Sequence, residues 1–220
     1  MNNLVLITSI INTPNIPLSY TNVRSVFSHE ERFIQTKKTI ETIKKNIPNA
    51  KIIMVECSSL TTEQNTYLLS NVDYFINLID NQEEQKNIYS MSKALGEGTM
   101  TMCAINYIIS NNIQFDNLFK ITGRYWLSDN FNYHNFDNDK IVVTNICGVS
   151  TNTSLYKLNK KYVDNFYEFL FSNIDNMCKC IGYETLFSSF LKTVDASSII
   201  VLNKIGVNGF ISVSNDFVNC

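Results

Sequence analysis

Residues 4–10 read LVLITSI, a nearly continuous apolar run close to the start of the chain. Such a run is typical of a strand that helices cover on both faces, because neither side of the strand has to face solvent. Pro14 and Pro17 follow it and predict a long irregular loop. The chain therefore opens with a buried strand followed by a loop.

Three further candidate strands follow, separated by segments with helical spacing of their apolar residues. The strands are expected at residues 51–56, 72–79 and 115–121, and the helices at 30–47, 62–69 and 92–110. Strands that alternate with helices form right-handed βαβ units. The first half of the chain thus predicts a Rossmann-like parallel sheet with helices on both faces.

The second half of the chain has a different pattern. Strand-like runs at 140–146 and 154–158 lie close together, and candidate helices at 160–171 and 183–193 precede a strand at 198–202. This order favours mixed strand directions, with an antiparallel portion that completes an α/β sheet. Because no linker separates the halves, we expect one domain over residues 1–220.

The composition is that of a globular protein. Of the 220 residues, 45% are hydrophobic and 17% are charged, which argues against a disordered chain and against several membrane spans. Residues 4–11 are too few to form a span. A formal net charge of −2 without a basic block is unlike a nucleic-acid-binding protein. Six scattered cysteines predict reduced, mostly buried thiols in a cytoplasmic protein, rather than a disulfide framework or a zinc site.

Polar residues follow each of the first four predicted strands. In open α/β sheets, ligands bind at the carboxyl ends of the strands. The residues at these ends are Thr8 and Ser9, then Glu56 with Ser58 and Ser59, then Asp80, and finally Thr122, Gly123, Arg124 and Tyr125. These positions are the first candidates for a binding site.

The chain contains only three arginines, and all of them lie near these strand ends. Arg24 and Arg32 follow the first strand, and Arg124 follows the fourth. A guanidinium group suits phosphate because two of its N–H groups can meet two oxygens at once. We therefore expect Arg32 and Arg124 to hold a diphosphate, the alternative being surface ion pairs.

Residues 92–98 read SKALGEG and precede a helical pattern. Lys93, the backbone amides around Gly96 and the helix dipole could together face an anion. The spacing is neither that of a P-loop nor that of a dinucleotide-binding glycine motif. An ordinary loop is the alternative reading of this segment.

Taken together, these segments resemble a glycosyltransferase of the GT-A type, especially the small single-domain enzymes of viral and bacterial polysaccharide synthesis. The resemblance covers nearly the whole chain and rests on residues 6–9, 28–36, 56–58, 92–97, 119–125, 181–186 and 205–209. It implies a GT-A fold with a mixed, mainly parallel central sheet. Residues 1–125 would form the half that binds a nucleotide-sugar, and residues 126–220 the acceptor and catalytic half.

The activity that the resemblance implies is transfer of a hexosyl or deoxyhexosyl group from a nucleotide-sugar to a glycan or another hydroxyl acceptor. The residues it implies for donor binding are Thr8, Arg32, Glu56, Lys93, Gly96, Glu97, Lys120, Thr122, Gly123 and Arg124. Thr8, Arg32 and Glu56 would surround the base and ribose. Lys93, Lys120 and Arg124 would approach the diphosphate.

Glu184 begins a late helix, where inverting GT-A enzymes often place the general base. The alternative is a carboxylate that the helix dipole favours at this position. Tyr125 and Trp126 could stack on an acceptor sugar, or they could complete the core.

The resemblance fails at the metal site. GT-A enzymes usually place an Asp-x-Asp that holds Mn or Mg after the fourth strand, where this chain has Thr122-Gly123-Arg124. Two readings stay open: Lys120 and Arg124 supply the positive charge, or a metal uses Asp80 or the pair Asp137 and Asp139.

Two other functions share this architecture. A sugar nucleotidyltransferase would use the same cations on a triphosphate, but residues 8–16 contain no glycine for its opening loop. A carbohydrate-binding module without turnover is the non-enzymatic reading.

Overall fold

The computed structural model describes residues 1–144, 146–147 and 150–220, and its centre is a seven-stranded sheet. The strands, in spatial order, are β10 (Ile199–Leu202), β6 (Ile141–Thr144), β9 (Leu155–Asn159), β4 (Asn117–Thr122), β1 (Asn3–Ser9), β2 (Ala50–Glu56) and β3 (Tyr74–Asn77). Every neighbouring pair is parallel except the two that involve β9. The predicted mixed, mainly parallel sheet is confirmed, with its antiparallel portion reduced to one strand.

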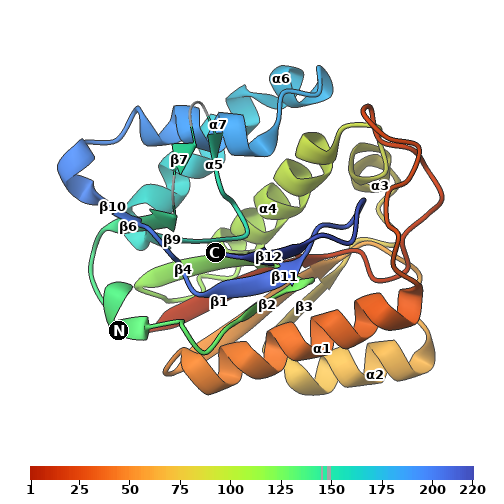
Figure 1. Cartoon of the computed structure of the whole chain (residues 1–220), viewed down its shortest axis with the longest axis horizontal. Coiled ribbons are helices and arrows are strands. Elements are labelled where there is room, and N and C mark those ends of the chain that lie inside the picture. Colours follow the sequence, from red (N-terminus) through yellow and green to blue (C-terminus); the bar gives the residue numbers. More distant parts are fainter. Residues whose placement is uncertain (145, 148–149) are drawn as a thin grey trace.

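Helices cover both faces of this sheet, as Figure 1 shows. One face carries α1 (His29–Asn46) and α2 (Thr62–Asn71); the other carries α4 (Lys93–Ser110), α5 (Val163–Ser172) and α7 (Tyr183–Leu191). Alternate residues of β1 enter the two cores, Leu4 and Leu6 on the α4 side and Val5 and Ile7 on the α1 side. This two-sided burial explains the continuous apolar run of the first strand.

The sequence analysis did not predict two short helices. They are α3 (Gln82–Ile88), which follows the β3 strand, and α6 (Ile174–Cys178), which lies between α5 and α7. Both are too short for helical spacing of apolar residues to be recognised in the sequence.

A small second sheet pairs the end of the chain with β5. Its strands are β12 (Phe217–Asn219), β11 (Val207–Phe210) and β5 (Tyr125–Leu127), and a further pair is β7 (Ile146–Cys147) with β8 (Ser150–Thr151). Gly206 has φ +81° and Gly209 lies against the Tyr125 ring, so a side chain at either position would collide. The sequence analysis did not predict β11 or β12, because both are short and polar in part.

The long loop after β1 is held in place by Arg24. Its guanidinium donates to the carbonyls of Ile16 (3.0 Å), Ile88 (3.1 Å) and Tyr89 (3.1 Å), and also to that of Ser90. Every guanidinium nitrogen of Arg24 therefore donates to a backbone oxygen, and its role is to join this loop to the segment between α3 and α4.

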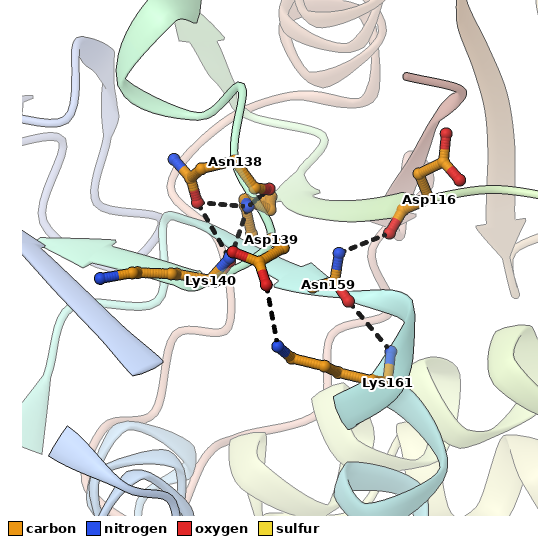
Figure 2. A network of polar contacts seen from close by, with 7 residues as sticks. Asp116, Asn138, Asp139, Lys140, Asn159 and Lys161 are labelled. Atoms are coloured by element: carbon orange, nitrogen blue, oxygen red, sulfur yellow. Dashed lines mark hydrogen bonds and ion pairs between the residues drawn. The ribbon is translucent and has the colours of Figure 1, made fainter. Parts of the chain in front are cut away.

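At the amino ends of the parallel strands, Lys157 is fully buried on β9. Its Nζ donates to the carbonyls of Asn138 (2.7 Å) and Lys140 (2.6 Å) and to Asn138 Oδ1 (3.0 Å). Figure 2 shows the polar network around this turn, including the exposed ion pair of Lys161 with Asp139. Burial lowers the pKa of Lys157 to about 8, against the weaker opposing effect of Asp139 and Asp137.

Within the described residues, no helix is long and apolar enough to cross a membrane. The five cysteines whose side chains are described are unpaired. Cys57 is buried as expected, but Cys178, at the end of α6, and Cys180, on the turn that follows it, are exposed, so the expectation of mostly buried thiols is only partly right. Cys147 lies outside the residues whose side chains are described.

Lys157 should make stability depend on pH in alkaline solution. The pKa of Lys157 in the folded protein lies below its ordinary value of 10.5, so between about pH 8 and 10.5 the unfolded chain binds the additional proton. The free energy of unfolding of the wild type, measured by urea denaturation, should therefore rise with pH relative to that of Lys157→Met. A difference between the two proteins that stays constant over this range would contradict the assignment.

Candidate functional site

A cavity of about 720 Å³ opens at the carboxyl end of β4. Its volume lies within the roughly 300–1,000 Å³ typical of small-molecule sites. It is bounded by the loop after β1, the starts of α4 and α7, the turn between β4 and β5, residues 150–154 and residues 218–220. Its polar lining includes Tyr20, Lys93, Glu97, Lys120, Thr122, Arg124, Thr153 and Glu184.

Arg124 stands between this cavity and a smaller one of about 100 Å³. It lies on the turn that joins β4 to β5, and the centre of its guanidinium is 5.0 Å from the Tyr125 ring centroid. Its Nε is buried without a hydrogen-bond partner. A buried donor that is left unpaired costs free energy, so Arg124 is suited to an oxygen-rich ligand.

Lys120, which is buried, and Glu97, whose side chain is 14% exposed, form an ion pair in the wall of the cavity. Thr8 Oγ1 donates to the same oxygen, Glu97 Oε1, at 2.7 Å. Burial alone would raise the pKa of Glu97, but the charge and hydrogen bond of Lys120 and the hydrogen bond of Thr8 outweigh it, and the pKa is lowered. Glu97 therefore stays ionised and neutralises Lys120.

Lys93 is the first residue of α4, is exposed and lines the cavity. Partial desolvation at the cavity, followed by the charge of Arg124, lowers the pKa of Lys93, and the carboxylate of Glu184 opposes the shift. Lys93, Arg124 and Glu184 thus line the same cavity, and their charges interact there.

Glu184 lies in the first turn of α7 and faces the cavity. Its Oε1 accepts a hydrogen bond from Thr153 Oγ1 at 3.4 Å. Tyr20, from the loop after β1, lines the same cavity. The pKa of its phenol is raised, mainly by burial; the charge of Arg124 opposes this shift and that of Glu184 adds to it. The sequence analysis missed Tyr20 and Thr153, because nothing in their local sequence marks them as neighbours of Glu184.

The smaller cavity extends toward the end of β1. Thr8, Arg32 and Thr122 line it, and Arg32 is only 8% exposed. Arg32 Nε donates to the Ile10 carbonyl at 2.7 Å, and burial, then the charge of Arg124, lowers the pKa of Arg32 to about 10. The two arginines predicted to act together therefore do lie near each other, with Arg32 partly occupied by the backbone.

The expectation that Glu56 lies beside the base and ribose of a donor needs correction, because this residue lines neither described cavity. Its side chain is fully buried, and its oxygens accept from the amides of Ile11, Cys57 and Ser58 and from Ser58 Oγ. This carboxylate joins the ends of β1 and β2 and has no surface left for a ribose.

Two glycines predicted to bind the donor have packing roles instead. Gly96 lies inside α4, which begins at Lys93 behind the N-cap Ser92; it borders the smaller cavity, and a Cβ there would lie 2.9 Å from the Ile88 carbonyl oxygen. The helix expected at 92–110 is therefore present, and the alternative reading of residues 92–98 as an ordinary loop is wrong. At Gly123, a Cβ would lie 2.9 Å from that of Ser9, so this glycine lets the turn approach β1.

Tyr125 and Trp126 point in different directions because successive residues of a strand face opposite sides. Tyr125 lines the large cavity. Trp126 instead packs on Phe210 and Phe217, with Lys38 Nζ 3.8 Å from its ring centroid. The prediction that Trp126 contacts an acceptor is replaced by a role in the packing of the small sheet.

The predicted metal ligands do not meet at the cavity. Asp80 follows β3 and lines neither described cavity, and Asp137 and Asp139 lie near the amino ends of the strands, where they interact with Tyr133 and Lys161. Among the residues that the structure describes, no three His, Cys, Asp or Glu side chains are grouped to hold a metal ion. The carboxylates that the sequence offered as metal ligands are therefore not gathered at the cavity.

Loss of the Glu97 charge should destabilise the protein. Glu97→Gln would leave the buried Lys120 uncompensated, and breaking a buried ion pair costs about 3–5 kcal/mol. The double variant Glu97→Gln/Lys120→Met should regain much of this loss in the free energy of unfolding, measured by denaturant titration. A single variant within about 1 kcal/mol of the wild type would contradict the structural role of the pair.

No protein-family model matches the sequence. A segment of 114 residues is 32% identical to DNA-directed RNA polymerase subunit beta'' of Plasmodium falciparum. This match covers 51% of the chain and 10% of that subunit, which is too little to show a common family.

Solved glycosyltransferase structures share the fold. GlyE of Streptococcus pneumoniae TIGR4 matches 91% of this chain with a TM-score of 0.51 and 13% identity, and the chain spans 45% of the length of that structure. A glycosyltransferase involved in the glycosylation of the major capsid of PBCV-1 matches 92% of this chain and 82% of its own, with a TM-score of 0.51 and 10% identity. The chain therefore has the GT-A fold that its sequence predicted, the fold of these glycosyltransferases.

Proposed function

We propose that the protein is a glycosyltransferase that moves a sugar from a nucleotide-sugar donor to a hydroxyl acceptor. The observation that carries the proposal is the convergence of Arg124, Lys93 and Glu184 on one cavity at the carboxyl end of β4. Cations suit the diphosphate of the donor, and a carboxylate suits the acceptor hydroxyl. The fold supports the proposal because it is shared with solved glycosyltransferases.

The donor would lie across the two adjoining cavities. Arg124 and Lys93 would meet the diphosphate, and Thr8, Arg32 and Thr122 line the smaller cavity beside them. Residues 1–125 would supply most of these donor contacts, while Thr153, Glu184 and residues 218–220 bound the remaining space for the acceptor.

Glu184 would act as the general base of an inverting transfer. The acceptor oxygen attacks the anomeric carbon while its proton passes to a Glu184 oxygen; the bond between that carbon and the diphosphate oxygen breaks, and its electron pair leaves with the nucleoside diphosphate. Thr153 would orient the carboxylate through its hydrogen bond to Oε1. The transferred group would be a hexosyl or deoxyhexosyl unit, and the acceptor a glycan.

A donor-hydrolysis screen tests the proposed function. We expect slow release of nucleoside diphosphate from one of the UDP-, GDP-, CDP- or dTDP-sugars, because transferases often pass their donor sugar to water. Release of pyrophosphate from a nucleoside triphosphate and a sugar phosphate would instead indicate a nucleotidyltransferase. A protein that binds glycans and releases neither product would be a binding module.

Glu184→Gln should lower turnover by about 10² or more while leaving donor affinity nearly unchanged, because the amide cannot accept the proton. Steady-state kinetics and calorimetry of donor binding measure the two quantities. Glu63→Gln is the matched control, since Glu63 is also the second residue of a helix but is exposed on α2. Turnover of Glu184→Gln equal to that of Glu63→Gln would remove Glu184 from the mechanism.

A further inference from the structure

The site has an unusual arrangement of charge for its fold. The GT-A resemblance implies a divalent ion held by an Asp-x-Asp, yet Thr122-Gly123-Arg124 occupies that place and puts a guanidinium into the cavity. The carboxylates that the sequence offered instead, Asp80, Asp137 and Asp139, line neither described cavity. The question is which groups then balance the charge of a diphosphate.

The two carboxylates that line the large cavity are poor candidates for a metal site. Glu97 already accepts from Lys120 and Thr8 through one oxygen. Glu184 lies near Lys93, whose pKa also responds to Arg124. A divalent ion at Glu184 would therefore meet two positive side chains, and like charges repel most strongly where water is partly excluded.

Some cations near the site already have partners within the protein, and others are free to meet a ligand. Lys120 is only 1% exposed and is neutralised by Glu97, and all three guanidinium nitrogens of Arg24 donate to backbone carbonyls. Arg124 retains a buried Nε without a partner and lines both cavities. Lys93 shares the larger cavity with Arg124. Arg32 lines the smaller cavity and not the larger one, and its Nε is used by the Ile10 carbonyl. The positive charge available in the larger cavity therefore lies at Arg124 and Lys93.

We infer that Arg124, assisted by Lys93, takes the place of the divalent ion, so that this protein binds a diphosphate and transfers its sugar without a metal. The inference rests on the proposed function. As the bond between the anomeric carbon and oxygen breaks, the diphosphate gains the electron pair, and the guanidinium N–H groups of Arg124 stabilise the added negative charge. Lys120 has a structural role, contrary to the first of the two readings left open by the sequence.

Calorimetric titration with UDP, GDP, CDP and dTDP, each in excess EDTA and in excess MnCl₂, tests this inference. One of the four should bind with a Kd that changes by less than about threefold between the two conditions, a difference of under 1 kcal/mol. Arg124→Ala should weaken that binding by about tenfold or more in both conditions, and Arg124→Lys by less, because it keeps the charge but loses the paired donors.

Lys161→Ala is the control, since Lys161 pairs with Asp139 at the opposite edge of the sheet and should leave binding unchanged. Thermal denaturation of each variant separates a loss of binding from a loss of folding. Binding that appears only with manganese would overturn the inference and leave the proposed function standing. Wild-type affinity in Arg124→Ala would also overturn it. No binding of any of the four diphosphates in either condition would overturn both.

Discussion

Glu97 and the buried Lys120 form an ion pair between α4 and β4, and Thr8 of β1 donates to the same carboxylate oxygen. These contacts connect the two central parallel strands with the helix that covers them. Removing two charges from water is costly unless each finds a close partner, so the pair constrains how α4 can lie on the sheet. It also forms part of the wall of the cavity.

The demand that buried charges be paired determines which cations are free to meet a ligand. Lys157 is satisfied by carbonyl and amide oxygens at the amino edge of the sheet, and Arg24 by carbonyls around the loop after β1. Arg124 differs because its Nε is buried without a partner beside the cavity. An orphaned donor at that place is the strongest single indication that the site binds an anion.

Sequence reasoning located much of the candidate site and failed where side chains turn away from it. The strand-end rule selected Thr122 and Arg124, which border both cavities, and Thr8, which borders the smaller one. The same rule selected Glu56, whose oxygens are used by nearby backbone amides. A strand end predicts where a residue lies, but the hydrogen bonds of its side chain depend on neighbours that are distant in sequence.

The sequence by itself determined the α/β class, the parallel first half of the sheet and the start of the helix that carries Glu184, because apolar periodicity and helix-start residues act locally. Only the tertiary structure decided that Lys120 is neutralised, that Trp126 packs away from the cavity, and that Tyr20 and Thr153 stand near Glu184. These outcomes depend on which segments meet across the sheet. Contacts between such segments have no periodic signature in the chain, since each is made by residues that are far apart in sequence.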